Sequence, residues 1–142
     1  MHPEKRFIAK ALKPVESEKI SGGYLKNFDG IFYNLFDNIY KKAISSDGIN
    51  IEIRYELQYK NQKFYIYIEN DYNCSANISE DELKVEQAKE LIQTGKYLEK
   101  VKGEGGTGIP KIVKIIAYDL KREPDIDFGY IKEKNIFFMK IR

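Results

Sequence analysis

The spacing of apolar residues changes from three and four to two near residue 48, and this change constrains the fold more than any other feature. Between Leu25 and Ala43 apolar side chains recur every three or four residues, which predicts an amphipathic helix. Residues 49–59 (INIEIRYELQY) alternate, and residues 64–68 (FYIYI) are β-branched or aromatic throughout, which predicts two strands. Residues 60–63 (KNQK) fit a hairpin turn between these strands.

The rest of the chain continues this mixture of helices and strands. Ser79 and Glu82 have the spacing of a capping box, which predicts a helix that ends near Gly95. Pro110 suits the first turn of another helix, and residues 126–131 and 135–141 are predicted to be strands. Residues 6–12 (RFIAKAL) fit either a short strand or one helical turn. These elements predict an α+β fold, a two-layer α/β sandwich with a mixed, mainly antiparallel sheet and helices on one face, and not a βαβ parallel fold.

Composition limits the class of protein. A length of 142 residues suits a single domain. The 24 basic and 22 acidic residues are mixed along the chain, unlike the basic footprint of a nucleic-acid binder, so no nucleic-acid partner is expected. The single cysteine, Cys74, excludes an internal disulfide and fits a reducing compartment. Because no apolar run is long enough for a membrane span or a secretory signal, we expect a cytoplasmic domain without membrane contact.

A first candidate site lies in the predicted helix between Leu25 and Ala43. Asn34 and Asn38 are four residues apart and Lys41 lies three further on, so the three share one helix face. Amide oxygens are hard ligands that suit Mg²⁺, and a lysine can contact phosphate. The alternative is that the two asparagines are ordinary surface residues of an amphipathic helix.

A second candidate is Glu69-Asn70-Asp71, which follows the strand predicted at residues 64–68. A carboxylate or amide at the end of a strand can accept a hydrogen bond from an adenine amino group. The alternative is that these polar residues simply end the strand, because Asn and Asp are common in turns.

A third candidate is the run Gly103-Glu104-Gly105-Gly106-Thr107-Gly108, just before the helix predicted at Pro110. Closely spaced glycines let backbone N–H groups approach phosphate, and the start of a helix favours anions. The run lacks the ending of a Walker motif and the βαβ context of a Rossmann fingerprint. The alternative is a structural loop, although four glycines are costly to order.

Taken together and in this order, the three sites resemble the N, G1 and G2 boxes of the GHKL ATPase superfamily. The resemblance covers about residues 24–141 and leaves residues 1–23 as an N-terminal extension. Residues 34–41 (NLFDNIYK) resemble the histidine-kinase N box, N-L-L-x-N-A-x-K, and residues 105–109 (GGTGI) resemble the G2 box. The G1 box, usually D-x-G-x-G, reads NDYNC at residues 70–74, and is Asn-led as in quorum-sensing receptor kinases.

The resemblance implies the Bergerat fold and a site for ATP with Mg²⁺, with residues 71–102 as the lid region. Asn38 would ligate Mg²⁺ with help from Asn34, and Lys41 would contact phosphate. Asn70 would accept the adenine amino group, or Asp71 would if the register is shifted by one residue. The phosphates would be wrapped by the glycine run, with the binding residues Gly103, Gly105, Gly106, Thr107 and Gly108.

The resemblance also limits the reaction. Hydrolysing members of the superfamily place a Glu where this chain has Asn34, which favours the kinase pattern over efficient hydrolysis. Because the only histidine is His2, a phospho-acceptor is expected on a further domain or a protein partner. Two alternatives stay open: a non-catalytic switch that orders its lid on binding ATP, and a decayed fold that binds no nucleotide and only mediates protein contacts.

Overall fold

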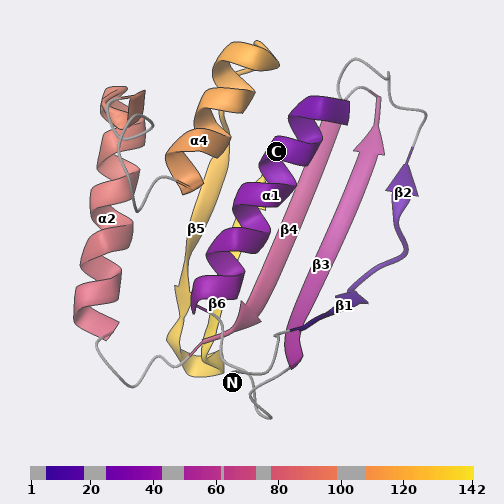
Figure 1. Ribbon diagram of the computed structural model, residues 1–142, viewed down its shortest axis with the longest axis vertical. Helices are drawn as coiled ribbons and strands as arrows, with labels where there is room; N and C mark the ends of the chain where they lie inside the picture. The colour runs from indigo at the N-terminus through magenta and orange to yellow at the C-terminus, as the bar shows by residue number, and fades with distance from the viewer. Residues whose placement is uncertain (1–5, 18–24, 43–49, 62, 73–77, 99–107) are drawn as a thin grey trace. The chain divides into compact units, whose positions relative to one another are not determined.

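The computed structural model describes residues 6–17, 25–42, 50–61, 63–72, 78–98 and 108–142, which form helices and one sheet (Figure 1). The helices are α1 (Leu25–Lys42), α2 (Ile78–Thr94) and α4 (Gly108–Lys114), and α4 continues as the π-helical turn η2 (Ile115–Asp119). The strands are β1 (Arg6–Ala11), β2 (Glu16–Ser17), β3 (Asn50–Lys60), β4 (Lys63–Asp71), β5 (Ile126–Ile131) and β6 (Ile136–Ile141), and the 3-10 turn η3 (Lys132–Lys134) links the last two. These elements confirm the predicted α+β class and are those of a two-layer α/β sandwich.

The chain divides into two compact units, and each is described by itself. The sheet unit contains all the strands named above, within Met1–Lys19, Ile39–Ile78 and Asp125–Arg142. The helical unit comprises Ile20–Asn38 and Ser79–Pro124, and so includes α4, η2 and most of α1 and α2. The single domain predicted for residues 1–142 stays a prediction.

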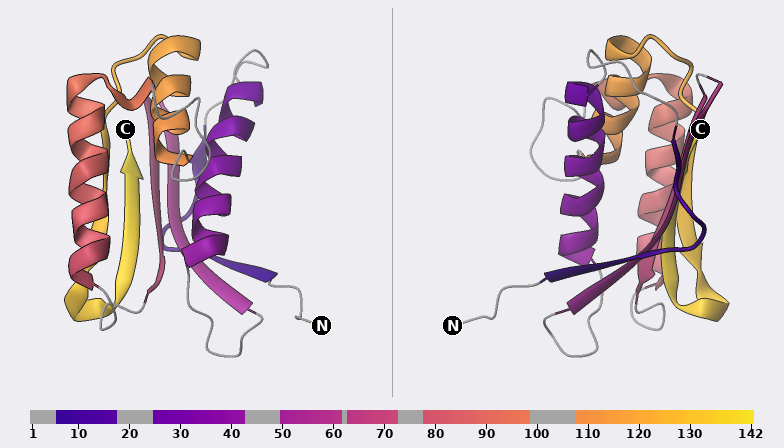
Figure 2. Two further views of the ribbon diagram at one scale, coloured as in Figure 1. Left: turned by 60° about the vertical axis from the view of Figure 1, so that its left-hand side comes forward. Right: turned by 90° about the vertical axis from the view of Figure 1, so that its right-hand side faces the viewer.

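The sheet is mixed and mainly antiparallel, as predicted. Its strand order is β1-β3-β4-β6-β5, and β2 also pairs with β3. The pairs β3–β4, β4–β6 and β5–β6 are antiparallel, whereas β1 and β2 run parallel to β3, where Figure 2 shows β1 beside the start of β3. Residues 6–11 are therefore a strand and not a helical turn. Because β1 leads through α1 to a parallel β3, one βαβ connection occurs, although the sheet as a whole is not a parallel fold.

Strand alternation gives the sheet two chemically different faces. The register pairs Ile53 with Asn70 and Arg54 with Glu69, which sets the residues that share each face. We call one the apolar face; its buried apolar side chains are Ile51, Ile53, Ile66, Ile68, Phe128, Phe137, Met139 and Ile141. We call the other the charged face; its ionic side chains include Lys10, Glu52, Arg54, Glu56, Glu69, Asp71 and Lys140.

Element boundaries differ from the predictions at several places. Strand β4 continues to Asp71, so the second candidate site forms the end of the strand instead of following it. Helix α2 begins at Ile78, one residue before the predicted cap at Ser79. The last helix widens into a π-helical turn, in which the Leu120 N–H donates to the Ile115 carbonyl at 2.9 Å.

Candidate functional site

Asn34 of α1 is the candidate metal ligand whose side chain the structure describes. Its Nδ2 donates a hydrogen bond to the Gly30 carbonyl oxygen, one turn earlier, at 2.7 Å. This bond sets the orientation of the amide, so Oδ1 is the atom with which Asn34 can ligate a cation. Asn38 and Lys41 follow in α1, on the predicted spacing, but their side chains lie outside the described part of the chain.

Close packing within the helical unit holds the α1 backbone at this point. A Cβ added at Gly30 would lie 2.9 Å from the Ile115 Cδ1 atom of η2, which is too close for an ordinary contact. A side chain at this position would require the end of the Ile115 side chain to move, and the carbonyl that orients Asn34 belongs to this same glycine. Ile112 and Val113 of α4 are fully buried, so α4 is also firmly packed.

The glycine run is described only at its end. Gly108 is the first residue of α4, and Pro110 is buried in the first turn, where a proline suits a helix start. Gly103, Gly105, Gly106 and Thr107 lie outside the described residues. Their contact with phosphate therefore stays a prediction.

Asn70 lies near the end of β4 and points to the apolar face of the sheet. Its side chain is only 2% exposed, and its nearest neighbours in register are Ile53 of β3 and Phe137 of β6. Asn70 Nδ2 donates a hydrogen bond to the main-chain oxygen of Asp71 at 3.0 Å. As at Asn34, the amide nitrogen is held by a backbone carbonyl, so the oxygen is the atom that the side chain can offer to a ligand.

Three aromatic rings lie on the same face, beside Asn70. Phe137 is the register partner of both Asn70 and Tyr130, and the Phe137 and Tyr130 ring centroids are 5.1 Å apart. Tyr72 continues the series, with its ring centroid 4.8 Å from that of Tyr130. The ring planes are tilted by 41° between Tyr72 and Tyr130 and by 57° between Tyr130 and Phe137, so the rings form an apolar cluster next to one hydrogen-bonding group, a combination that is common in ligand sites.

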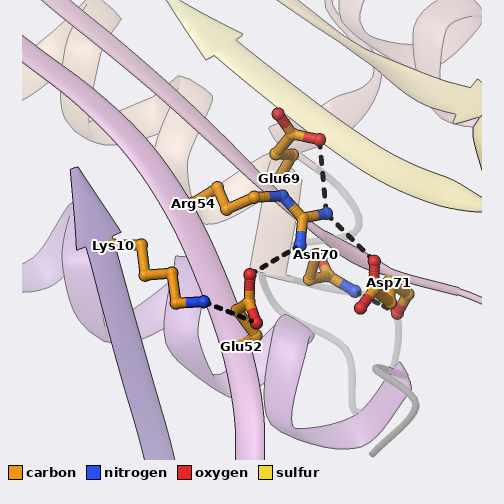
Figure 3. Close-up of polar contacts among 6 residues, drawn as sticks. All are labelled: Lys10, Glu52, Arg54, Glu69, Asn70 and Asp71. Carbon is orange, nitrogen blue, oxygen red and sulfur yellow. Dashed lines mark hydrogen bonds and ion pairs between the residues drawn. The ribbon is translucent and has the colours of Figure 1, made fainter. Parts of the chain in front are cut away.

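Asp71 points to the charged face, where it belongs to a network around Arg54 (Figure 3). Arg54 Nη2 lies 3.0 Å from Asp71 Oδ1 and 3.4 Å from Glu69 Oε2, and Nη1 lies 3.2 Å from Glu52 Oε1. Lys10 Nζ also contacts Glu52, at 3.3 Å. The two residues that flank Asn70 in sequence are thus both held by one guanidinium, from the opposite face.

The network shifts the proton affinity of its members. Burial alone would lower the pKa of Arg54, but its hydrogen bonds to Asp71 and Glu52 and the nearby carboxylates raise that pKa above the ordinary value, so the guanidinium stays charged. The hydrogen bonds from Arg54 and then from Lys10 lower the pKa of Glu52 below 4.5. Arg54 and Glu52 are therefore both charged at neutral pH.

Sequence reasoning missed four residues of this region: Arg54, Tyr72, Tyr130 and Phe137. Alternation along residues 49–59 does place Arg54 on the face opposite the isoleucines. Its partners on β4 follow only from the register of the hairpin. The aromatic rings come from three segments, and strand order across β4, β6 and β5 brings them together.

Other site types find no support in the described residues. No three His, Cys, Asp or Glu side chains of this part group in a way that could hold a metal ion, a result that does not concern amide ligands such as Asn34. Within the same residues, no helix combines the length and apolar character needed to span a membrane.

Comparison with known proteins gives one family. A family model described as y4jQ C-terminal putative histidine kinase domain matches residues 24–142. The match begins after β1 and β2 and covers every other described helix and strand. No curated protein matches the chain.

Proposed function

The chain belongs to the family of y4jQ C-terminal putative histidine kinase domains, and from that premise we propose that it binds ATP with Mg²⁺ as a GHKL-type domain with the Bergerat fold. Asn70 carries the proposal. Among the described residues Asn70 is the buried polar side chain, and the resemblance assigns it to the recognition of adenine. Its Nδ2 is paired with the Asp71 main-chain oxygen, so Oδ1 is the acceptor that this residue can offer on an otherwise apolar face, which supports a binding role.

Base recognition is assigned to Asn70 and not to Asp71. Asn70 Oδ1 accepts a hydrogen bond from the adenine amino group, and the rings of Tyr72, Tyr130 and Phe137 offer apolar contact to the base. Asp71 is an unsuitable alternative because it points to the other face and is paired with Arg54. An amide accepts this hydrogen bond without a full charge, so affinity for the base is lower than with a carboxylate.

Phosphate and metal recognition is assigned to α1 and the glycine run. The amide oxygens of Asn34 and Asn38 suit Mg²⁺, which prefers oxygen ligands, and the Nδ2 bond of Asn34 already orients its oxygen for this purpose. Lys41 contributes a positive charge to the phosphates. The backbone N–H groups of residues 103–108 complete the site.

The proposed reaction is transfer of the γ-phosphoryl group to a histidine of another domain or protein. A bond forms between an imidazole nitrogen and the γ-phosphorus, the bond to the bridging oxygen breaks, and ADP leaves. His2 is the only histidine in the chain, so the acceptor is assigned to a partner. A cytoplasmic location fits this use of ATP.

A second candidate is a nucleotide-gated switch that binds ATP without transferring phosphate. Asn70 in place of an acidic residue favours this candidate, because weaker base binding suits reversible occupancy. Asn34 is compatible with this candidate as well, because an amide cannot act as the general base that activates water for hydrolysis of bound ATP.

Titration calorimetry with the imido analogue of ATP and Mg²⁺ tests binding. We expect Asn70→Ala to weaken affinity about 3- to 10-fold, the loss of one hydrogen bond. Gln58→Ala is the matched control, because it removes an amide from the charged face, where Gln58 bonds Glu56 at 2.9 Å. An Asn70→Ala protein that folds and binds like the wild type would contradict the assignment, as would a wild type without measurable binding.

Two further arms separate the metal role from the reaction. Asn34→Ala is expected to reduce the gain in affinity that Mg²⁺ produces, with α1 intact by circular dichroism. Radiolabelled ATP is then incubated with the protein and with a separate histidine-bearing helical domain of the same kinase type. Label on that domain supports phosphotransfer, whereas binding without label supports the switch.

A further inference from the structure

The orientation of the Asn70 amide decides which purines it can recognise. An amide has a donor end and an acceptor end, and a rotation of 180° exchanges them. Adenine presents an amino donor at position 6, whereas hypoxanthine and guanine present an acceptor oxygen there. In this structure Nδ2 is bonded to the Asp71 main-chain oxygen, so the acceptor end is the one available to a base.

The Asp71 backbone is paired with a neighbouring strand on the β6 side and not in the described register on the β3 side. On the β6 side, pairing continues through Asp71 with Ile136, and the Tyr72 N–H donates to the Asn135 carbonyl at 2.8 Å. On the β3 side, the described register ends at the pair of Ile53 with Asn70. Beyond that pair, Arg54 reaches across from β3 and contacts the Asp71 carboxylate at 3.0 Å.

Arg54 is well placed to fix the position of Asp71. Its side chain is 20% exposed, and the same Nη2 atom also contacts Glu69 at 3.4 Å, so the residues on either side of Asn70 share one anchor (Figure 3). Glu52 bonds the other guanidinium nitrogen and is itself bonded by Lys10, which limits the movement of Arg54. Hydrogen bonds between charged groups are shorter and stronger than neutral ones.

We propose that Arg54 is a positioning residue for base selection: by fixing Asp71, it holds the carbonyl that locks the Asn70 amide with its oxygen toward the base. The lock favours 6-aminopurine nucleotides over 6-oxopurine nucleotides. Without it, the amide can rotate and serve either base. This inference rests on the proposed nucleotide site, and it concerns the choice of base at that site.

Affinities for ADP and IDP, measured by titration calorimetry with Mg²⁺, test the inference, because these bases differ in the group at position 6 and neither nucleotide turns over. We expect the wild type to prefer ADP. In Arg54→Met, which keeps an apolar stem and removes the guanidinium, the ADP/IDP preference should fall about 3- to 10-fold, the worth of one hydrogen bond. The fall should come mainly from tighter IDP binding.

Lys13→Met is the matched control. It removes one positive charge from an ion pair with a charged-face residue, Lys13 with Glu56 at 3.6 Å, and leaves the contacts of Arg54 in place. Its ADP/IDP preference should equal that of the wild type. Should Arg54→Met fail to fold, Asp71→Asn provides the same test, because it weakens the ion pair with Arg54 and keeps the main-chain carbonyl. The ADP/IDP preference of this variant should also fall.

The possible outcomes distinguish this inference from the proposed function. A folded Arg54→Met protein that keeps the wild-type preference, or loses affinity for both nucleotides equally, overturns the positioning role and leaves nucleotide binding intact. A wild type that binds ADP and IDP equally also overturns the positioning role and leaves nucleotide binding intact. A wild type that binds neither nucleotide overturns the proposed function and this inference with it.

Discussion

Asn70 and Asp71 are neighbours on β4, yet the two faces of the sheet to which they point have opposite chemistry. On the apolar face Asn70 is the one polar side chain buried among those described, with isoleucine and phenylalanine on the adjacent strands. On the charged face Asp71 is one of several ions that share Arg54. The difference teaches that burial of apolar side chains around one amide characterises the first face, whereas a network of ion pairs sets the geometry of the second.

The largest stability difference between the two faces is expected when a side chain of the apolar face is truncated. Ile66→Ala removes a side chain that is 1% exposed, and should lower the free energy of unfolding by about 2–5 kcal/mol because a cavity remains. Gln58→Ala, on the charged face of the neighbouring strand, should cost less than about 1 kcal/mol. Urea denaturation of both variants measures the two costs, and equal values would show that the faces do not differ as described.

A charge placed on the apolar face sharpens the comparison. Asn70→Asp removes the Nδ2 donor and buries a carboxylate, which should cost about 1–3 kcal/mol at neutral pH. Burial raises the pKa of that carboxyl in the folded state above the unfolded value of about 3.9. The folded state then binds a proton more tightly, so the cost is full at high pH and falls as the pH is lowered toward the unfolded value.

Denaturation of this variant and of the wild type between about pH 8 and about pH 4 measures the difference. A cost that stays constant over this range would mean that position 70 is hydrated and not part of the apolar face.

The smallest effect is expected on the charged face. Arg54→Met should lower stability by about 0.5–1.5 kcal/mol, because partly exposed ion pairs gain little over their hydration. Lys13→Met, which removes a cation more exposed than Arg54, should cost less than about 0.5 kcal/mol. Both costs should shrink in high salt.

The pH dependence of Arg54→Met has a defined sign. Because Arg54 and Lys10 lower the pKa of Glu52, their contribution is present above the ordinary value of 4.5 and is lost as the pH falls through the lowered value. The stability difference between Arg54→Met and the wild type should therefore shrink in acid. A difference that grows in acid would contradict the described network.

Periodicity predicted the helix α1, the hairpin of β3 and β4, the helix α2 and the pair β5–β6, because each depends on neighbours in sequence. The parallel partner of β1 could not be predicted in this way, since a short segment carries no signal for a strand some forty residues away. The π-helical turn at Ile115 was also missed. It lies beside Gly30, whose close approach to η2 is a property of tertiary packing.

The candidate site was also predictable only in part: residue types were predictable, and side-chain orientations were not. Asn34 and Asn70 were predicted from residue type and position, and the orientation of each amide came only from the carbonyls of Gly30 and Asp71. Strand alternation could have separated Asn70 from Asp71, had the strand been predicted to continue to residue 71. The contact of Arg54 with Asp71 needed the hairpin register as well.

Strand β1 lies outside the matched family region, which begins at residue 24, and yet it pairs with β3 along six residues. All six of its residues are exposed, so main-chain hydrogen bonds supply most of its attachment. A fragment trimmed to residues 24–142 would leave a row of unsatisfied N–H and C=O groups along β3. Such a fragment is expected to self-associate through this exposed edge, which β1 covers in the longer chain.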